Sequence, residues 1–372
     1  MGSNKCVKGH DDSVATRAFR LGYRPELDGL RGISILLVYF HHLYYPLVPG
    51  GFFGVDVFFV LSGFLITSLL LEEWSRQGSI SLKAFYIRRA LRLMPALLVV
   101  VLITGSFALF LLKGRRAVET YQGIWLTLSY ASNWFYAFTL FSANNPLGIT
   151  WSLAIEEQFY LTWPLLLALF LRFRLGHRWI LYGLTLLIVL ISLHRKILVA
   201  QGGSIFRLYY ASDTRADTLL IGCLAGILIS WNLLPYDTRF KVFMKSSAAL
   251  AVIFLAYLVG ISSWTDLMLY QHGGYTLVAL SIALILTVVI IWPPKFVLLV
   301  LKFAPLVWIG RISYGLYLWH WPVRWFIYQK KAMPSSGAQL VTAIVLSLSL
   351  TALSYYFIEK PFLRWKKRFG YK

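Results

Sequence analysis

The sequence has 372 residues, of which 58% are hydrophobic and 14% are charged, and its formal net charge is +21. A soluble domain holds about 45–50% apolar and about 25% charged residues, so the composition excludes a disordered chain, a coiled coil and a soluble enzyme with one core. Too little of the chain can face water to carry a nucleic-acid-binding surface, and a polytopic helical membrane protein is the class that remains.

Ten stretches are candidates for membrane-spanning helices, which need about 20 mostly apolar residues each. They are residues 32–47, 52–71, 94–112, 156–171, 179–193, 217–234, 248–264, 275–292, 305–325 and 338–358. An aromatic-rich stretch, 124–141, is ambiguous. If it does not cross and the N-terminus is cytoplasmic, 26 Lys and Arg lie inside and 10 outside; if it crosses, each side holds 18. Because Lys and Arg favour the cytoplasmic side, the sequence predicts an all-α bundle of ten spans with both termini cytoplasmic. The stretch 124–141 is then a buried segment that does not span, and it lies outside the membrane or re-enters it.

The predicted organisation has three parts. Residues 1–31 form a cytoplasmic N-terminal tail, residues 32–361 the membrane domain, and residues 362–372 a basic cytoplasmic C-terminal tail. The two cysteines lie far apart in sequence without ligand spacing, so neither a disulfide scaffold nor a structural zinc site is expected.

The first predicted span carries charged and titratable residues, which are costly in a membrane and therefore suggest function. It is preceded by Asp28 and Arg31 and contains His41 and His42. Arg31 and His42 are eleven residues apart, so they share one helix face about 16 Å apart, whereas His41 is rotated by about 100°. The spacing favours His42 as the partner of Arg31, although a pair of interfacial histidines without a function fits as well.

The second predicted span contains Asp56, which needs a partner such as Arg31, a histidine or a helix end. A basic cluster follows it in the loop before the third span. There Arg89 and Arg92 are neighbours on one helical face, with Arg88 beside them. Paired guanidinium groups could hold phosphates bidentately, but an ordinary positive cluster that contacts anionic lipid is the simpler interpretation.

The fourth predicted span opens at its outer end with Glu156 and Glu157, followed by Tyr160. Adjacent carboxylates point about 100° apart on a helix, so at most one faces a shared cavity. An acidic first turn favoured by the helix dipole, with Ser152 as the N-cap, explains them equally well. In the ninth span, His320 lies between two tryptophans, a pattern more typical of structural packing. The sequence has no P-loop, HExxH or GxSxG motif.

Taken in order, these motifs resemble acyltransferase family 3, integral membrane O-acyltransferases that acetylate bacterial surface carbohydrates. The matching pieces are Pro25–Gly32 with His42, Gly54–Ile66, Phe85–Pro95, Trp151–Tyr160 and Ser313–Pro322. Together they extend over nearly the whole chain, and the usual ten-span topology of the family agrees with the charge count.

The resemblance implies roles for these residues. Arg31 and His42 fall on the family's Arg-to-His pair, Arg89 and Arg92 on its Arg-x-x-Arg pair, and Glu156 on its carboxylate. It implies that acyl-coenzyme A is the donor, with its phosphates held by the arginines, and that no metal takes part. His42 would act as general base or acyl carrier toward a hydroxyl of a carbohydrate or lipid-linked glycan.

The expected protein is therefore an O-acyltransferase of the bacterial cytoplasmic membrane, in contact with lipids and not with nucleic acid. The acyl group is expected to be acetyl. Two other classes stay open on the residues alone. A proton-coupled transporter of a small acid would suit Arg, His and Glu inside a bundle, and a structural membrane subunit would need its polar residues confined to span ends.

Overall fold

The computed structural model describes residues 20–139, 145–328 and 333–369. Helices dominate this part of the chain, which contains no strand, so the predicted all-α class is confirmed there. The elements of the first half are α1 (Pro25–Leu43), η1 (Tyr45–Leu47), α2 (Phe53–Gln77), α3 (Leu82–Leu111), α4 (Arg115–Leu128), α5 (Ser132–Phe138), η2 (Gly148–Thr150), α6 (Trp151–Arg172), α7 (His177–Ala200) and α8 (Ile205–Tyr210). Those of the second half are α9 (Ser212–Ser230), α10 (Thr238–Ile261), α11 (Leu267–Gln271), α12 (Gly274–Ile291), α13 (Lys295–Leu301), α14 (Ala304–Arg311), α15 (Ser313–Tyr328), α16 (Gly337–Ser354), η3 (Tyr355–Glu359), α17 (Lys360–Lys366) and η4 (Lys367–Phe369).

Six helices in the described ranges are long and apolar enough to cross a membrane. They are α2, α3, α7, α10, α12 and the continuous stretch Gly337–Lys366 made by α16, η3 and α17. The other four predicted spans fall on α1, α6 and α9 and on a broken pair, because the stretch 305–325 is interrupted at Ile312 between α14 and α15. The bundle therefore fits a multi-pass membrane protein, and the count of ten spans stays a prediction.

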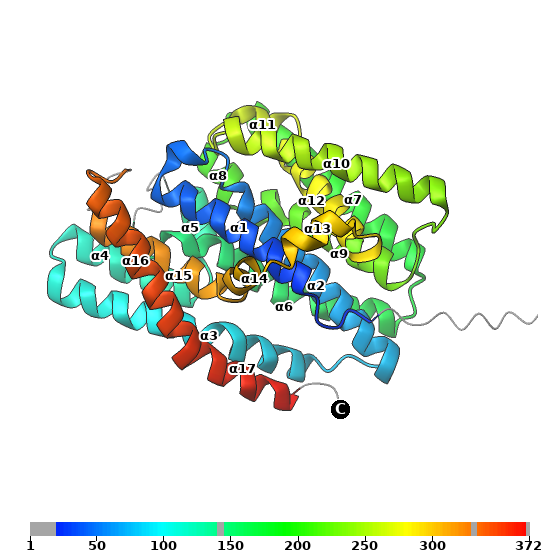
Figure 1. The fold of residues 1–372 in the computed structure, drawn as a ribbon, viewed down its shortest axis with the longest axis horizontal. Helices are drawn as coiled ribbons and strands as arrows, with labels where there is room; N and C mark the ends of the chain where they lie inside the picture. The colour runs from blue at the N-terminus through cyan, green and yellow to red at the C-terminus, as the bar shows by residue number, and fades with distance from the viewer. Residues whose placement is uncertain (1–19, 140–144, 329–332, 370–372) are drawn as a thin grey trace, which may run out of the picture.

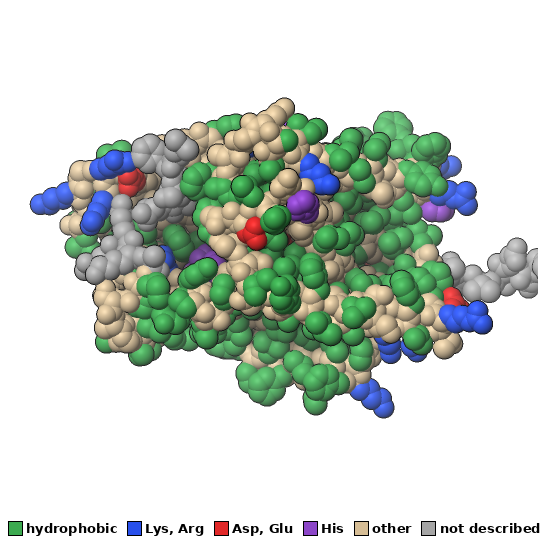
Figure 2. Space-filling model, turned by 90° about the horizontal axis from the view of Figure 1, so that it is seen from above, with side chains coloured by type: hydrophobic (Ala, Val, Ile, Leu, Met, Phe, Trp, Pro, Cys, Tyr) green, Lys and Arg blue, Asp and Glu red, His purple; other side chains and the backbone are tan. Residues whose placement is uncertain are grey.

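Most long helices run along the long axis of the molecule (Figure 1). Helices α10 and α11 lie along one long side, and α3 and α17 along the opposite one. On the face shown in Figure 2, hydrophobic side chains cover most of the surface, and most of the visible Lys and Arg lie toward the two ends. An apolar exterior with charged ends is the surface that a bilayer requires.

The first and last helices begin and end beyond the predicted domain boundaries. Helix α1 begins at Pro25, not at residue 32, because proline is pre-organised for the first helical position and Glu26 and Asp28 favour the first turn. At the other end, α17 continues the last long helix to Lys366 and packs against α3. The predicted tail of residues 362–372 thus starts as helix. Residues 1–19 and 370–372 of the predicted tails lie outside the described part.

The stretch 124–141 forms the end of α4 and the whole of α5, and its last two residues lie outside the described part. Between the helices, Tyr130 adopts left-handed backbone with φ of 51°. Helix α5 has seven residues, or about 10 Å, which is too short for a hydrocarbon core of about 30 Å. After it, every described residue from 145 to 152 is buried, so α6 begins inside the protein.

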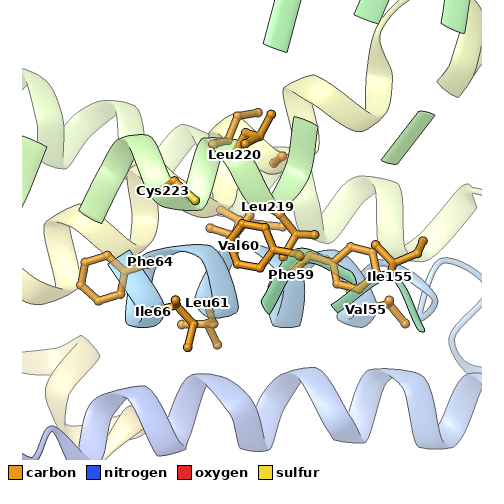
Figure 3. Packing of buried hydrophobic residues seen from close by; sticks show 14 of the residues in the cluster. Val55, Phe59, Val60, Leu61, Phe64, Ile66, Ile155, Leu219, Leu220 and Cys223 are labelled. Carbon is orange, nitrogen blue, oxygen red and sulfur yellow. The ribbon is translucent and has the colours of Figure 1, made fainter. Parts of the chain in front are cut away.

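The core is built around the contact between α2 and α9, the most extensive helix pair in the molecule. Gly63 of α2 faces the backbone oxygen of Leu219, and Gly222 of α9 faces that of Val60, with no room for a Cβ at either position. Small residues at such crossings let two backbones approach closely. Figure 3 shows Phe59 and Val60 of α2 lying beside Leu219 of α9 in this core.

Candidate active site

A cavity of about 460 Å³ lies between α1, α2, α3, α6 and α15, within the range of about 300–1,000 Å³ that is usual for small-molecule sites. Residues 21–23 and Lys366 also line it, so the first and last described segments of the chain meet at this cavity. Its polar lining consists of Arg31, Ser62, Arg89, Arg92, Ser152, Glu156, Tyr160, Ser313, Tyr314, Tyr317 and Lys366, and much of the rest is apolar wall from α2.

Three arginines converge on this cavity, and none of them forms a salt bridge with a described carboxylate. Arg31 comes from α1, and Arg89 and Arg92 come from consecutive turns of α3; all three are half-buried. Within the described part of the chain, none of them forms a hydrogen bond or salt bridge, and the Nε atoms of Arg31 and Arg89 are buried without a partner. Unpaired charge away from water is costly. The cluster is therefore suited to an anionic ligand that forks of guanidinium N–H groups can grip.

A carboxylate and two hydroxyl groups stand beside the arginines. Ser62 of α2 donates a short hydrogen bond to Glu156 Oε1 of α6. The Tyr160 hydroxyl, one turn after Glu156, lies 2.8 Å from Ser62 Oγ and 3.1 Å from Glu156 Oε1. The guanidinium of Arg89 sits 3.6 Å above the ring of Tyr160, a cation–π contact. This network connects the helix that carries Glu156 to the one that carries the arginine pair.

Glu156 lies deeper in the protein than a helix entrance at the surface would place it. Its helix begins at the buried Trp151, and Glu156 lines the same cavity as Arg89 and Arg92. Ser152 is not an N-cap either: it lies inside α6, with its Oγ 2.6 Å from the hydroxyl of Tyr317. The charge pattern identified Glu156 as a candidate site residue but did not show how deep in the protein it lies. The reason is that the chain is already buried from residue 145, before α6 begins.

His42 does not line the cavity but is connected to it through α15. Tyr317 lines the cavity, and its ring centroid is 5.7 Å from that of His320. His320, one helical turn further along α15, is fully buried, and its Nε2 lies 2.9 Å from His42 Nδ1. The sequence suggested a packing role for His320 between its tryptophans. The structure places it directly against His42.

His41 and His42 have different surroundings although they are adjacent in sequence. His41 Nδ1 lies 3.1 Å from the carbonyl oxygen of Val48, and its ring packs edge-on against Tyr45 and Phe52. His41 therefore ties the end of α1 to the start of α2. Of the two, His42 is the one that contacts the histidine on α15.

Besides the two histidines, three further predicted site residues do not line the cavity. Asp56 pairs with Arg215 of α9 at 2.8 Å, and both side chains are fully buried, so its partner is none of those expected. Asp28 accepts from the Tyr23 hydroxyl and lies 3.7 Å from Arg311. Arg88, expected beside the phosphate-binding pair, points to Glu73 at 3.4 Å instead. A helix turns by about 100° per residue, so neighbours in a basic run cannot all face one cavity.

Sequence reasoning missed Ser62, Tyr317 and Lys366, which line the cavity. The first two lie in segments that carry the family resemblance, but no role was predicted for either. Lys366 was predicted to lie in the C-terminal tail. The apolar helix that precedes it was the one sequence feature that could have indicated that Lys366 reaches the cavity.

In the described ranges, no three His, Cys, Asp or Glu side chains lie close enough together to bind a metal ion.

Comparison with known proteins gives one family match and several curated relatives. The family model described as an acyltransferase domain, acyltransferase family 3, matches residues 24–359. The peptidoglycan O-acetyltransferase OatA of Listeria monocytogenes is 33% identical over 360 residues, which are 93% of this chain and 57% of OatA. A protein of Bacillus subtilis named "Putative peptidoglycan O-acetyltransferase YrhL" is 35% identical over 355 residues, 91% of this chain and 55% of the relative.

The chain thus spans little more than half the length of these relatives. No solved structure matches it. The family match extends from the start of α1 to the end of η3 and includes the residues that carry the resemblance, from Arg31 to His320. The chain belongs to acyltransferase family 3.

Proposed function

We propose that this protein is a membrane O-acyltransferase that moves an acyl group, expected to be acetyl, from acyl-coenzyme A to a hydroxyl of a carbohydrate. One observation carries the proposal: three guanidinium groups that form no salt bridge with a described residue converge on a cavity that also holds a carboxylate. Tyr317 in the wall of this cavity contacts His320, which contacts His42. A transporter of a small acid would need a polar path across the bundle, whereas the wall here is largely apolar outside this cluster.

The arginine cluster supports a donor that carries phosphates. Acyl-coenzyme A holds its charges at one end and its thioester at the end of a long neutral arm. Arg31, Arg89 and Arg92 would bind the phosphates, with Lys366 as a fourth cation at the same cavity. The apolar side chains of α2 would line the path of the neutral arm. To reach His42, the thioester has to pass Tyr317, which separates the cavity from the histidine pair.

His42 would act as the general base. The acceptor hydroxyl gives its proton to the imidazole as its oxygen attacks the thioester carbon, the carbon–sulfur bond breaks, and the thiolate takes the proton as coenzyme A leaves. Glu156 would orient the donor or the acceptor through its network with Ser62 and Tyr160. The thioester supplies the driving force, so this scheme uses no step at a metal.

The acceptor to test first is peptidoglycan, because two of the relatives are named for it. The protein would then work in the cytoplasmic membrane of a bacterium, with both termini on the side where coenzyme A is available. Residues 21–23 and Lys366 line the same cavity, which supports a common side for both termini.

The experiment is mass spectrometry of cell-envelope glycans from cells with the gene, without it, and with the His42→Ala variant. We expect O-acyl groups that are present with the gene and absent in the other two strains. Glycans that are equally modified in all three strains would contradict the proposal.

A further inference from the structure

The two buried histidines His42 and His320 form a hydrogen-bonded chain that ends on a backbone carbonyl. His320 Nδ1 lies 2.9 Å from the oxygen of Leu316, one turn earlier on α15. His320 Nε2 lies 2.9 Å from His42 Nδ1. The chain therefore runs from a carbonyl through both nitrogens of one ring to the inner nitrogen of the other.

The protons of this chain can be placed because a carbonyl oxygen only accepts. The bond to Leu316 requires the proton of neutral His320 on Nδ1, which leaves a lone pair on its Nε2. The contact between the rings then requires His42 to donate from Nδ1. With its one proton on Nδ1, neutral His42 carries its lone pair on Nε2, the nitrogen that faces away from His320. The bond made by one ring nitrogen thus sets the state of the other.

The surroundings hold this arrangement in place. His320 is fully buried, and the rings of Tyr39 and Tyr317 pack against it at centroid distances of 6.0 and 5.7 Å. No carboxylate of the described residues bonds to either histidine ring. Arg324 donates from Nε to the backbone oxygen of His42 at 2.5 Å, which fixes the end of α1.

We propose that His320 is a positioning residue that holds His42 as the tautomer protonated on Nδ1, so that Nε2 is the base that meets the acceptor hydroxyl. The inference rests on the proposed function of His42. When Nε2 takes the hydroxyl proton, the Nδ1–H bond to His320 stabilises the resulting imidazolium, and the proton leaves again from Nε2 to the thiolate. A histidine thus fills the orienting role that a carboxylate has in other acid–base sites.

The direct test is the tautomer of His42, read by nitrogen NMR of purified protein with labelled histidine, in which His42→Ala identifies the signals. We expect His42 in the wild-type protein to be protonated on Nδ1 only. In His320→Phe, which keeps a ring but removes both nitrogens, we expect this preference to be lost. His42 protonated on Nε2 in the wild type, or an unchanged tautomer in His320→Phe, would overturn the inference.

Kinetics separate orientation from a merely structural role. His320→Phe should lower kcat by about 100-fold, at the lower end of the contribution of a positioned acid–base group, with the dissociation constant for coenzyme A unchanged within about twofold. In His320→Gln the amide oxygen can accept a hydrogen bond from His42 Nδ1. The kcat of this variant should therefore be about tenfold higher than that of His320→Phe. His41→Phe, beside the pair but bound to Val48, should leave the His42 tautomer unchanged.

Equal losses in His320→Phe and His320→Gln would mean that an acceptor for His42 Nδ1 makes no difference to the rate, and this would overturn the inference. If His42→Ala is inactive while His320→Phe turns over at the wild-type rate, this inference fails and the proposed function stands. If His42→Ala keeps its turnover, the proposed base itself is wrong. Should His320→Phe fail to fold, the wild-type tautomer and the rate of His320→Gln still decide.

Discussion

Replacing Arg92 tests whether the arginine cluster binds the phosphates of the donor. Arg92 lines the cavity from α3, is half-buried and forms no salt bridge with a described residue. A hydrogen bond to a charged group contributes about 1.5–3 kcal/mol, so Arg92→Ala should raise the dissociation constant of coenzyme A roughly 10- to 150-fold. Arg92→Lys should recover only part of the loss, because an ammonium keeps the charge but lacks the planar fork.

The assay is titration calorimetry of the purified protein with coenzyme A and with pantetheine, which lacks the phosphates. Pantetheine binding should change little in either variant. Lys83→Ala is the matched control, because Lys83 lies nine residues earlier on the same helix and is exposed to solvent. It should leave both dissociation constants within about twofold of the wild-type values.

An affinity for coenzyme A that is unchanged in both Arg92 variants would refute the phosphate clamp. The cluster would then be a lipid-facing positive patch, whose loss alters insertion or yield without changing donor binding. An equal loss of affinity for pantetheine would also refute it, because the effect would then not depend on phosphate.

Three further predictions concern the histidines, the topology and the core. His42→Ala should abolish acyl transfer, whereas His41→Ala should keep most of it, measured as acylated product per protein; equal losses would contradict the assignment. After replacement of the two native cysteines, a cysteine at Gly176 should be labelled only from the inside and one at Met333 only from the outside, and the reverse would mean that residues 124–141 cross. Asp56→Ala should destabilise the fold by about 3–5 kcal/mol, because it leaves the buried arginine of α9 unpaired; an unchanged midpoint of thermal unfolding would contradict this.

The sequence predicted the helical class and most of the helices because apolar stretches of membrane length are visible without knowledge of tertiary contacts. It did not predict the break at Ile312, where one apolar stretch becomes α14 and α15. Hydropathy does not record how a helix must bend to pack against its neighbours. Proline at position 25 and the acidic residues of the first turn are signals for a helix that begins at Pro25. The charged residues before residue 32 led instead to the prediction of a cytoplasmic tail.

For the site, motif spacing gave Arg31, Arg89, Arg92 and Glu156, and the fold brings these four to one cavity. Spacing along one helix could not reveal contacts between helices. The partner of Asp56 lies 159 residues away on α9, and that of His42 lies 278 residues away on α15. Such pairings depend on which helices pack together, which composition and periodicity do not contain.

The release of coenzyme A tests the central claim most directly. Wild-type protein in lipid vesicles, supplied with acetyl-coenzyme A and soluble peptidoglycan fragments, should release free thiol and acetylate the fragments in equal amounts. Vesicles with His42→Ala should bind coenzyme A and release no thiol above background. Movement of acetyl-coenzyme A or acetate across the vesicle membrane without thiol release would contradict the account and identify a transporter.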